Sequence, residues 1–136
     1  MSQNPEGITA IFPDEQRSKA TFSPAIRAGD FLFISGMTAL GEDRQVVGGN
    51  DIAAQARYIY QKMGRILAAA GVGFEAVVET VDYVTTFEGY ENTAQVRREV
   101  FGDGPYPAAT GVKVSALVRP QALIEIKATA WLGARK

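Results

Sequence analysis

The residue types available for chemistry in this chain are few, because the sequence contains neither His nor Cys. Serine–histidine and cysteine–histidine nucleophiles, histidine-based zinc sites and the usual neutral-pH general base are therefore excluded. Catalysis would have to rest on carboxylates, Lys, Tyr, hydroxyl groups or backbone groups. Glu125 is the leading candidate, since a carboxylate between Ile124 and Ile126 on a predicted strand is a usable general acid or base. The alternative is a structural ion pair with Lys127 or with another chain.

Other side chains are candidates for contact with a small ligand. Thr110 and the backbone of Gly111 can hydrogen-bond a substrate oxygen, although Thr in a strand more often serves the sheet alone. Arg119, in a predicted turn, either supplies a cation to a cleft or is simply solvated. Phe22 and Tyr106 either stack on a planar ligand or serve packing.

Charge and length exclude further classes of protein. The 136 residues include 14 Lys and Arg against 15 Asp and Glu, without a run of five like charges. Nucleic-acid binders and polybasic membrane binders carry a basic excess that is missing here. No stretch approaches the length of a membrane span, and the N-terminus lacks a signal-peptide pattern, so we expect a cytoplasmic protein without nucleic-acid or membrane partners. Residues 1–136 are predicted to form a single domain, with 1–14 as a loosely held N-terminal segment.

Hydrophobic patterning predicts the elements that must position these residues. A helix is expected at 52–70, with Asn50 or Asp51 as its N-cap and Gly71 at its end. A second helix is expected at 90–101. Strands rich in β-branched and aromatic residues are predicted at 20–27, 31–36, 77–86, 109–117 and 123–132.

The last predicted strand shows which side of the sheet is buried. Ile124, Ile126 and the alternate residues that follow form an apolar core face, while the opposite face still carries Leu123 and Trp131 among polar residues. Two helices can cover one face of such a mixed sheet in an α+β architecture. The simplest way to bury the apolar residues of the other face is a symmetric homo-oligomer, with clefts between its subunits.

Several short motifs, in this order and spacing, resemble the YjgF/RidA-like family, also known as L-PSP endoribonucleases or translation inhibitors. The resemblance covers about residues 20–132. It rests on Phe22-Ser23-Pro24-Ala25 before Gly29-Asp30, Phe33-Ile34-Ser35-Gly36, Gln55-Ala56-Arg57, Ala69-Ala70-Gly71 and Ile124-Glu125-Ile126-Lys127-Ala128. It implies a chorismate-mutase-like α+β fold, with two helices on one face of a mixed sheet. It also implies a homotrimer around a central barrel, with small-molecule clefts between subunits.

The resemblance further implies an activity, namely the hydrolysis of reactive imines and enamines to ketones and ammonia without a metal or a cofactor. Glu125 matches the cleft Glu proposed to hold or activate the attacking water, and Ser35 and Gly36 match the strand end beside the cleft. In such a site Thr110 and the Gly111 N–H would stabilise the charge that develops on the adduct.

Three positions depart from the family pattern. Ala109 stands where the deaminating members carry an Arg that pairs with the substrate carboxylate, and this lost contact would cost about 2–5 kcal/mol of binding. Ala94 replaces a cleft Asn, and Phe22 stands where Tyr is common. We therefore expect a hydrolytic deaminase for an imine, enamine or similarly activated C–N bond of a small metabolite, but not for a typical 2-iminoacid. The alternative is a non-catalytic trimer that binds a small molecule or regulates another protein.

Overall fold

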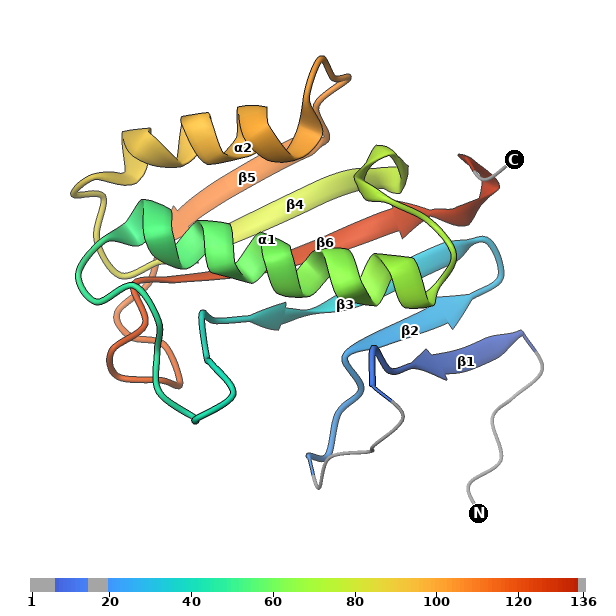
Figure 1. Cartoon of the computed structure of the whole chain (residues 1–136), viewed down its shortest axis with the longest axis horizontal. Helices are drawn as coiled ribbons and strands as arrows, with labels where there is room; N and C mark the ends of the chain where they lie inside the picture. The colour runs from blue at the N-terminus through green and yellow to red at the C-terminus, as the bar shows by residue number, and fades with distance from the viewer. Residues whose placement is uncertain (1–6, 15–19, 135–136) are drawn as a thin grey trace.

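Two helices lie on one face of a six-stranded mixed sheet in the computed structural model, which describes residues 7–14 and 20–134 (Figure 1). The strands lie in the order β1-β2-β3-β6-β4-β5. Only β4 and β5 run parallel among these neighbours, as expected for two strands joined by a helical crossover. The bounds are β1 Ile8–Ile11, β2 Ala25–Ala28, β3 Phe31–Met37, β4 Val77–Val84, β5 Ala108–Lys113 and β6 Ile124–Trp131. The expected α+β class is confirmed.

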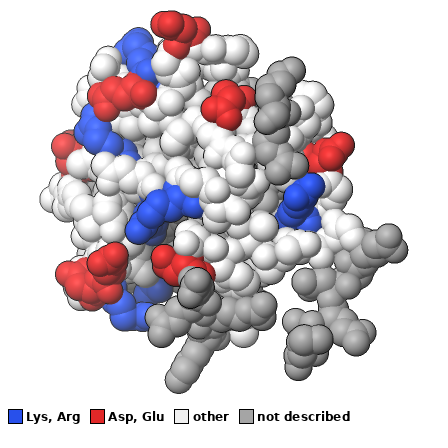
Figure 2. Space-filling view, turned by 45° about the vertical axis from the view of Figure 1, so that its right-hand side comes forward, with Lys and Arg blue, Asp and Glu red and all other residues white. Residues whose placement is uncertain are grey.

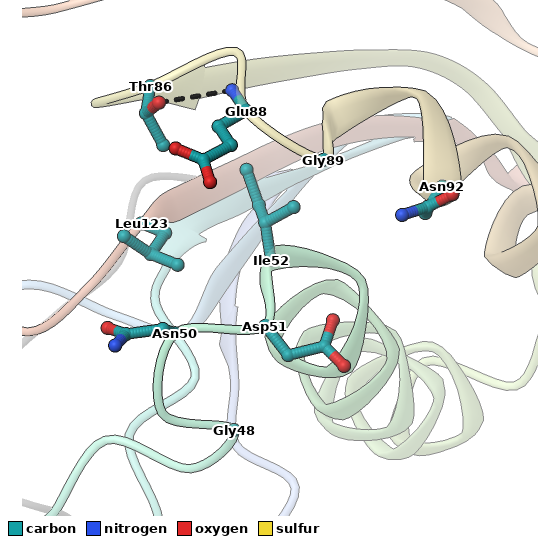
Figure 3. Close-up of a pocket in the computed structure, with 9 residues that line it drawn as sticks. All are labelled: Gly48, Asn50, Asp51, Ile52, Thr86, Glu88, Gly89, Asn92 and Leu123. Atoms are coloured by element: carbon teal, nitrogen blue, oxygen red, sulfur yellow. Dashed lines mark hydrogen bonds between the residues drawn. The ribbon is translucent and has the colours of Figure 1, made fainter.

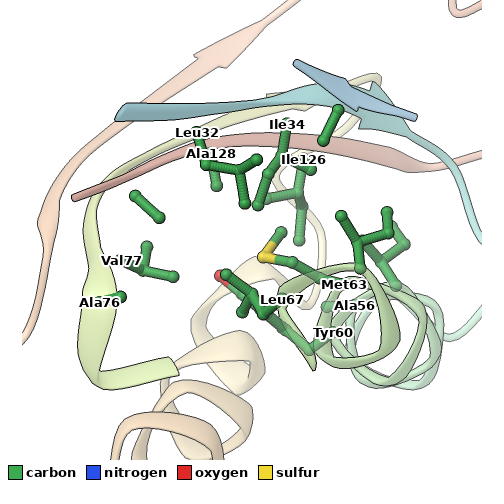
Figure 4. Close-up of a cluster of buried hydrophobic side chains, with 14 of the residues drawn as sticks. Leu32, Ile34, Ala56, Tyr60, Met63, Leu67, Ala76, Val77, Ile126 and Ala128 are labelled. Carbon is green, nitrogen blue, oxygen red and sulfur yellow. The ribbon is translucent and has the colours of Figure 1, made fainter. Parts of the chain in front are cut away.

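The long helix α1 (Ile52–Ala69) forms as its sequence predicts. The Asp51 carboxylate caps it by accepting a hydrogen bond from the Ala54 N–H at 3.1 Å. Gly71, with a φ of 84°, takes the left-handed conformation that lets the chain turn away after the helix. Between these ends, Met63 and Leu67 are fully buried and point toward the sheet (Figure 4). One stripe of α1 therefore covers the middle of the sheet.

The central strand β6 separates the two faces of the sheet. Its alternate residues Ile124, Ile126, Ala128 and Ala130 are all buried under the helices. The side chains between them face the other way, and Trp131 pairs with Phe31 while Thr129 pairs with Phe33. We call the side away from the helices the open face; its exposed apolar residues include Phe31, Phe33, Val112 and Trp131, which are 39–50% exposed. The predicted alternation of β6 is confirmed, except that Leu123, just before the strand, packs against the core.

The short helix α2 (Thr93–Phe101) follows a 3-10 turn, Tyr90–Asn92, and lies beside α1 on the same face (Figure 1). The predicted helix 90–101 is thus divided at its start. Strand β5 ends at Lys113, four residues before the predicted end, and β2 begins only at Ala25. Pro24 lacks the N–H that a paired strand residue donates, which explains the late start of β2.

One strand lies in the segment that was predicted to be loosely held. Ile8–Ile11 forms β1, which pairs antiparallel with β2 from Ile8 opposite Ala28 to Ile11 opposite Ala25. The sequence did not predict this strand; residues 1–6 lie outside the described part. The strand escaped prediction because its side chains are exposed or only half-buried, so that backbone pairing rather than a buried apolar face holds it.

Candidate functional site

A cavity of about 470 Å³ lies where β3 extends past the start of β2 and its pairing with β6 becomes irregular. The irregularity falls between Ile34 and Met37. Five residues singled out from the sequence line this cavity together, although they come from four separate parts of the chain: Phe22, Ser35, Gly36, Arg119 and Glu125. Lys62, on α1, lines it as well.

The carboxylate of Glu125 lies directly over Gly36. A Cβ added at position 36 would collide with Oε2 of Glu125 and would lie 3.3 Å from its Cγ and Cδ. Glu125 is half-buried and has no hydrogen-bond or ion-pair partner within residues 7–14 and 20–134, so the alternative ion pair with Lys127 does not form there. A held but unpaired carboxylate is free to bind a water molecule or a polar ligand group.

Ser35 holds the other wall of the cavity. Its hydroxyl donates to the Ser23 carbonyl at 2.6 Å, and its backbone N–H donates to the Pro24 carbonyl at 3.0 Å. These two bonds tie the segment before β2 to the end of β3. Phe22, next along the chain, is 67% exposed at the cavity and presents an aromatic surface to any ligand.

Lys62 is the charged residue of the described cavity lining that the sequence did not single out. Its ammonium group donates to the backbone carbonyls of Thr38 at 2.8 Å and Leu40 at 3.0 Å. Burial lowers the pKa of Lys62 to about 8, with smaller contributions from the positive charges of Arg65 and Arg119. The available signal was its position at the border of the apolar stripe of α1, beside Met63, where a Lys is unusual.

Gln55 fixes the start of β6 relative to α1. Its side chain is fully buried, and its amide donates to the carbonyls of Gly49 at 2.8 Å and Gln121 at 3.2 Å. Its carbonyl oxygen accepts from the Leu123 N–H at 2.8 Å. Because buried amides must be satisfied, this arrangement pins the chain between Arg119 and Glu125 against the helix.

The remaining predicted residues, Tyr106, Ala109, Thr110 and Gly111, lie on or just before β5 and do not line this cavity. Thr110 is opposite Val81 of β4, and Val81 is opposite Lys127 of β6. Two strand spacings, about 10 Å, therefore separate Thr110 from β6 within one chain. The Tyr106 hydroxyl donates to the Gly102 carbonyl at 3.1 Å, although its ring remains exposed.

A buried polar cluster lies between β4 and the helices, behind β5. The Tyr90 hydroxyl donates to Asp82 Oδ2 at 2.7 Å and occupies the space that a Cβ on Gly111 would take. Oδ1 of Asp82 is buried without a partner in the described structure. Burial raises the pKa of Asp82, and the Tyr90 hydrogen bond and the charge of Arg97 offset this only in part. The sequence analysis did not single out Asp82, because its alternation with Thr80 and Val84 along β4 indicates only that it faces the core.

Arg97 completes this cluster from α2. Its guanidinium donates to the Tyr60 hydroxyl at 3.0 Å and to Thr80 Oγ1 at 3.1 Å, and it lies 5.4 Å from the centre of the Phe101 ring. Burial raises the pKa of Tyr60 to about 12, so this hydroxyl keeps its proton at neutral pH. Since these groups are largely satisfied by one another, the cluster is best understood as structural support for α2 and β4.

A second, larger hollow of about 810 Å³ contains none of the predicted site residues. It lies beside the start of α1, and the residues drawn around it include Asn50, Thr86 and Glu88 (Figure 3). Its Asp51 carboxylate is already used as the cap of α1, and the Glu88 N–H is bound by the Thr86 hydroxyl oxygen. The smaller cavity around Glu125 is therefore the better candidate for chemistry.

Metal and membrane sites receive no support from the described residues. Within 7–14 and 20–134 no three Asp or Glu side chains gather as metal ligands, and no helix is long and apolar enough to cross a bilayer. On the face shown in Figure 2, positive and negative side chains are interspersed rather than gathered by sign. That distribution differs from the continuous basic surface of a nucleic-acid binder.

Comparison with known proteins places these features in context. Residues 13–132 match the family model described as endoribonuclease L-PSP. The chain is 34% identical over 113 residues to the RutC family protein YjgH of Escherichia coli, covering 80% of this chain and 85% of that protein. It is 34% identical over 111 residues to the 3-aminoacrylate deaminase RutC of Acinetobacter baylyi, covering 82% and 86%.

Solved structures agree with this result. The Rid-family protein YyfA of Yersinia pestis, whose function is unknown, is similar with a TM-score of 0.82 and 26% sequence identity. The match covers 91% of this chain and 98% of that chain.

Proposed function

Because the chain belongs to the YjgF/RidA-like family, whose model is described as endoribonuclease L-PSP, we propose that its Glu125 cavity hydrolyses a reactive carbon–nitrogen bond. The substrate class is an imine, an enamine or a similarly activated C–N group of a small metabolite. The observation that carries the proposal is the Glu125 carboxylate, held over Gly36 at the cavity and left without a partner among the described residues. The similarity to a relative named 3-aminoacrylate deaminase supports the same reaction class.

The proposed reaction needs one water molecule and one proton carrier. Glu125 accepts a proton from water as the water oxygen bonds to the imine carbon, and it returns this proton to the imine nitrogen, which gives a neutral tetrahedral amino alcohol. The same carboxylate then transfers the hydroxyl proton of the amino alcohol to the nitrogen. As the C–O double bond forms, the C–N bond breaks and its electron pair leaves with ammonia, so that atoms and charge balance. Phe22, exposed at the rim, stacks on a planar or ring-bearing part of the substrate.

We also propose that the working unit is a homotrimer whose subunits bury their open faces around a central barrel. The exposed Phe31, Phe33, Val112 and Trp131 support this, because such a set of apolar side chains is costly in water. Strand β5 is an edge of the described sheet and exposed along its whole length. It is therefore available to bring Thr110 and the Gly111 N–H of one subunit to the Glu125 cavity of the next, where they stabilise the developing charge.

Substrate choice follows in part from Ala109. This residue is on β5, where its methyl group offers no charge to a carboxylate, so we propose that a typical 2-iminoacid is not bound in the manner of the deaminating relatives. The second candidate function is a non-catalytic trimer that binds a small molecule or regulates another protein. It is favoured by Ala109 together with Ala94, which is exposed on α2 and has no hydrogen-bonding group.

The proposal is tested by ammonia release from imines generated in solution, with and without a carboxylate. Glu125→Gln should lower kcat/KM about 100-fold or more, since general base catalysis contributes on that order. Glu42→Gln, which removes an exposed carboxylate from the loop after β3, is the matched control and should retain full activity. An unchanged rate in Glu125→Gln refutes the role of Glu125. Saturable ligand binding without any ammonia release favours the non-catalytic alternative.

A further inference from the structure

The charges of the Glu125 cavity do not balance. Lys62 and Arg119 line it together with one carboxylate, Glu125. Arg65 adds a third positive charge in an adjoining cavity of about 270 Å³, which Lys62 also lines and which contains Asp14. Within the described residues, neither carboxylate forms an ion pair with any of these cations.

Both cavity cations have donor groups to spare. The guanidinium of Arg119 makes no hydrogen bond or ion pair among the residues described, and Arg119 is only half-exposed. The ammonium group of Lys62 has three N–H donors and uses two of them on the carbonyls of Thr38 and Leu40. Partly buried cations that lack a counter-ion are stabilised by an anionic ligand, which would accept charge-assisted hydrogen bonds from both.

The bonding of Lys62 also decides between two chemical roles. An unprotonated amine acting as a nucleophile needs its lone pair free and directed at the substrate. The two carbonyl acceptors at 2.8 and 3.0 Å require N–H donors and therefore favour the protonated form. Lys62 is accordingly suited to bind an anion and unsuited to form a covalent adduct.

We propose that Lys62 and Arg119 together bind a carboxylate of the cavity's small-molecule ligand, from the α1 side of the cavity. The inference rests on the proposed function, because it assigns the substrate class of the same site. Ala109 on β5 supplies no cation for a carboxylate. In this proposal Lys62 on α1 and Arg119 in the turn before β6 supply two cations instead. The substrate is then an activated C–N compound that carries a carboxylate, oriented differently from one bound by an Arg at position 109.

The test measures binding of an unreactive acid, so that it does not depend on catalysis. Phenylacetate and its neutral isostere phenylacetamide are titrated into the full-length protein by calorimetry, with amide NMR shifts to locate the site. Phenylacetate should bind about 10- to 100-fold more tightly than phenylacetamide, as charge-assisted hydrogen bonds predict. Equal affinities, or no saturable binding of phenylacetate, overturn the inference.

Variants separate ligand binding from structural support. Arg119→Gln removes a cation that has no side-chain partner in the described part of the chain, so its expected loss of about tenfold or more in phenylacetate affinity is not an effect on folding. Lys62→Met should lose at least as much, while Lys62→Arg should retain most of the affinity. Arg98→Met, which removes an exposed charge from α2, is the matched control and should change little. Glu125→Gln should tighten phenylacetate binding, because it removes the cavity's negative charge.

Failure of the inference and failure of the proposed function are distinguishable. Phenylacetate binding through Lys62 and Arg119 without imine hydrolysis refutes only the reaction. Imine hydrolysis together with equal phenylacetate and phenylacetamide affinities refutes only the carboxylate site. If Lys62→Met and Arg119→Gln weaken phenylacetate binding no more than Arg98→Met does, the carboxylate is bound elsewhere and the inference is wrong.

Discussion

Replacing Gly36 by Ala should disable the proposed site without weakening the fold. Gly36 lies on β3 beneath the Glu125 carboxylate, and its φ is outside the left-handed region, so that Ala fits the backbone. The added Cβ would collide with Oε2 of Glu125 and would lie only 3.3 Å from Cδ. The colliding atom is the end of a flexible side chain, and the carboxylate can therefore move aside.

The size of the effect follows from this geometry. The carboxylate must retreat by about 1 Å to restore an ordinary contact distance. A displacement of that size at a reacting group can cost about 100-fold in rate, so we expect kcat/KM for imine hydrolysis to fall about 10- to 100-fold. The free energy of unfolding should change by less than about 1 kcal/mol, because Ala restricts the unfolded chain and nothing rigid is displaced.

The assay pairs ammonia release with urea unfolding, and a double variant isolates the cause. If Gly36→Ala acts through Glu125, adding it to Glu125→Gln should lower the residual rate no further. Full activity in Gly36→Ala would refute the claim that the carboxylate's position matters. A multiplicative loss in the double variant would show that Gly36 acts on something other than Glu125.

Three further predictions concern ionisable groups. Burial raises the pKa of Asp82 above its ordinary value of 3.8, so the folded state binds the carboxyl proton more tightly than the unfolded state does. The free energy of unfolding should therefore fall as pH rises from about 3.8 through the higher pKa of the folded state. Urea titrations at several pH values should show that Asp82→Asn removes this fall. Because burial lowers the pKa of Lys62 to about 8, the phenylacetate affinity measured by calorimetry should fall as pH rises above about 8. In Lys62→Arg the affinity should stay constant over the same pH range, because an Arg keeps its charge there. Glu99→Gln, which breaks the exposed 3.0 Å ion pair with Arg57, should leave the urea midpoint unchanged.

The elements of this fold could be predicted where local physics alone decides them. The helix α1 carries its own cap at Asp51, its own stop at Gly71 and an apolar stripe of the correct period. Strand β6 alternates so regularly that its buried face is evident from the sequence. Strand β1 could not be predicted in this way, because Ile8–Ile11 is held by backbone pairing with β2. The side chains of β1 show no alternation that would indicate this pairing.

The candidate site could be predicted only as separate parts. Motifs identified Ser35, Gly36 and Glu125 individually, but their proximity depends on β3 and β6 becoming neighbours across about 90 residues of intervening chain. The contact between Glu125 and the space above Gly36 is a property of that pairing and of the irregularity in β3. Thr110 lies two strands from β6 within one chain, so its predicted role beside Glu125 depends on the proposed contact with a second copy.

The charge of the cavity shows why a motif departure cannot by itself decide the substrate. Along the sequence, Ala109 removes the cation that a carboxylate requires, and Arg119 in a predicted turn is the candidate to supply a cation instead. Seen in the folded protein, the cavity around Glu125 is positive, because α1 carries Lys62 into it and the turn before β6 carries Arg119. Lys62 is held there by carbonyls 22 and 24 residues earlier in the chain, a contact that helical periodicity cannot reveal. Substrate charge therefore has to be argued from the balance of groups that share the cavity.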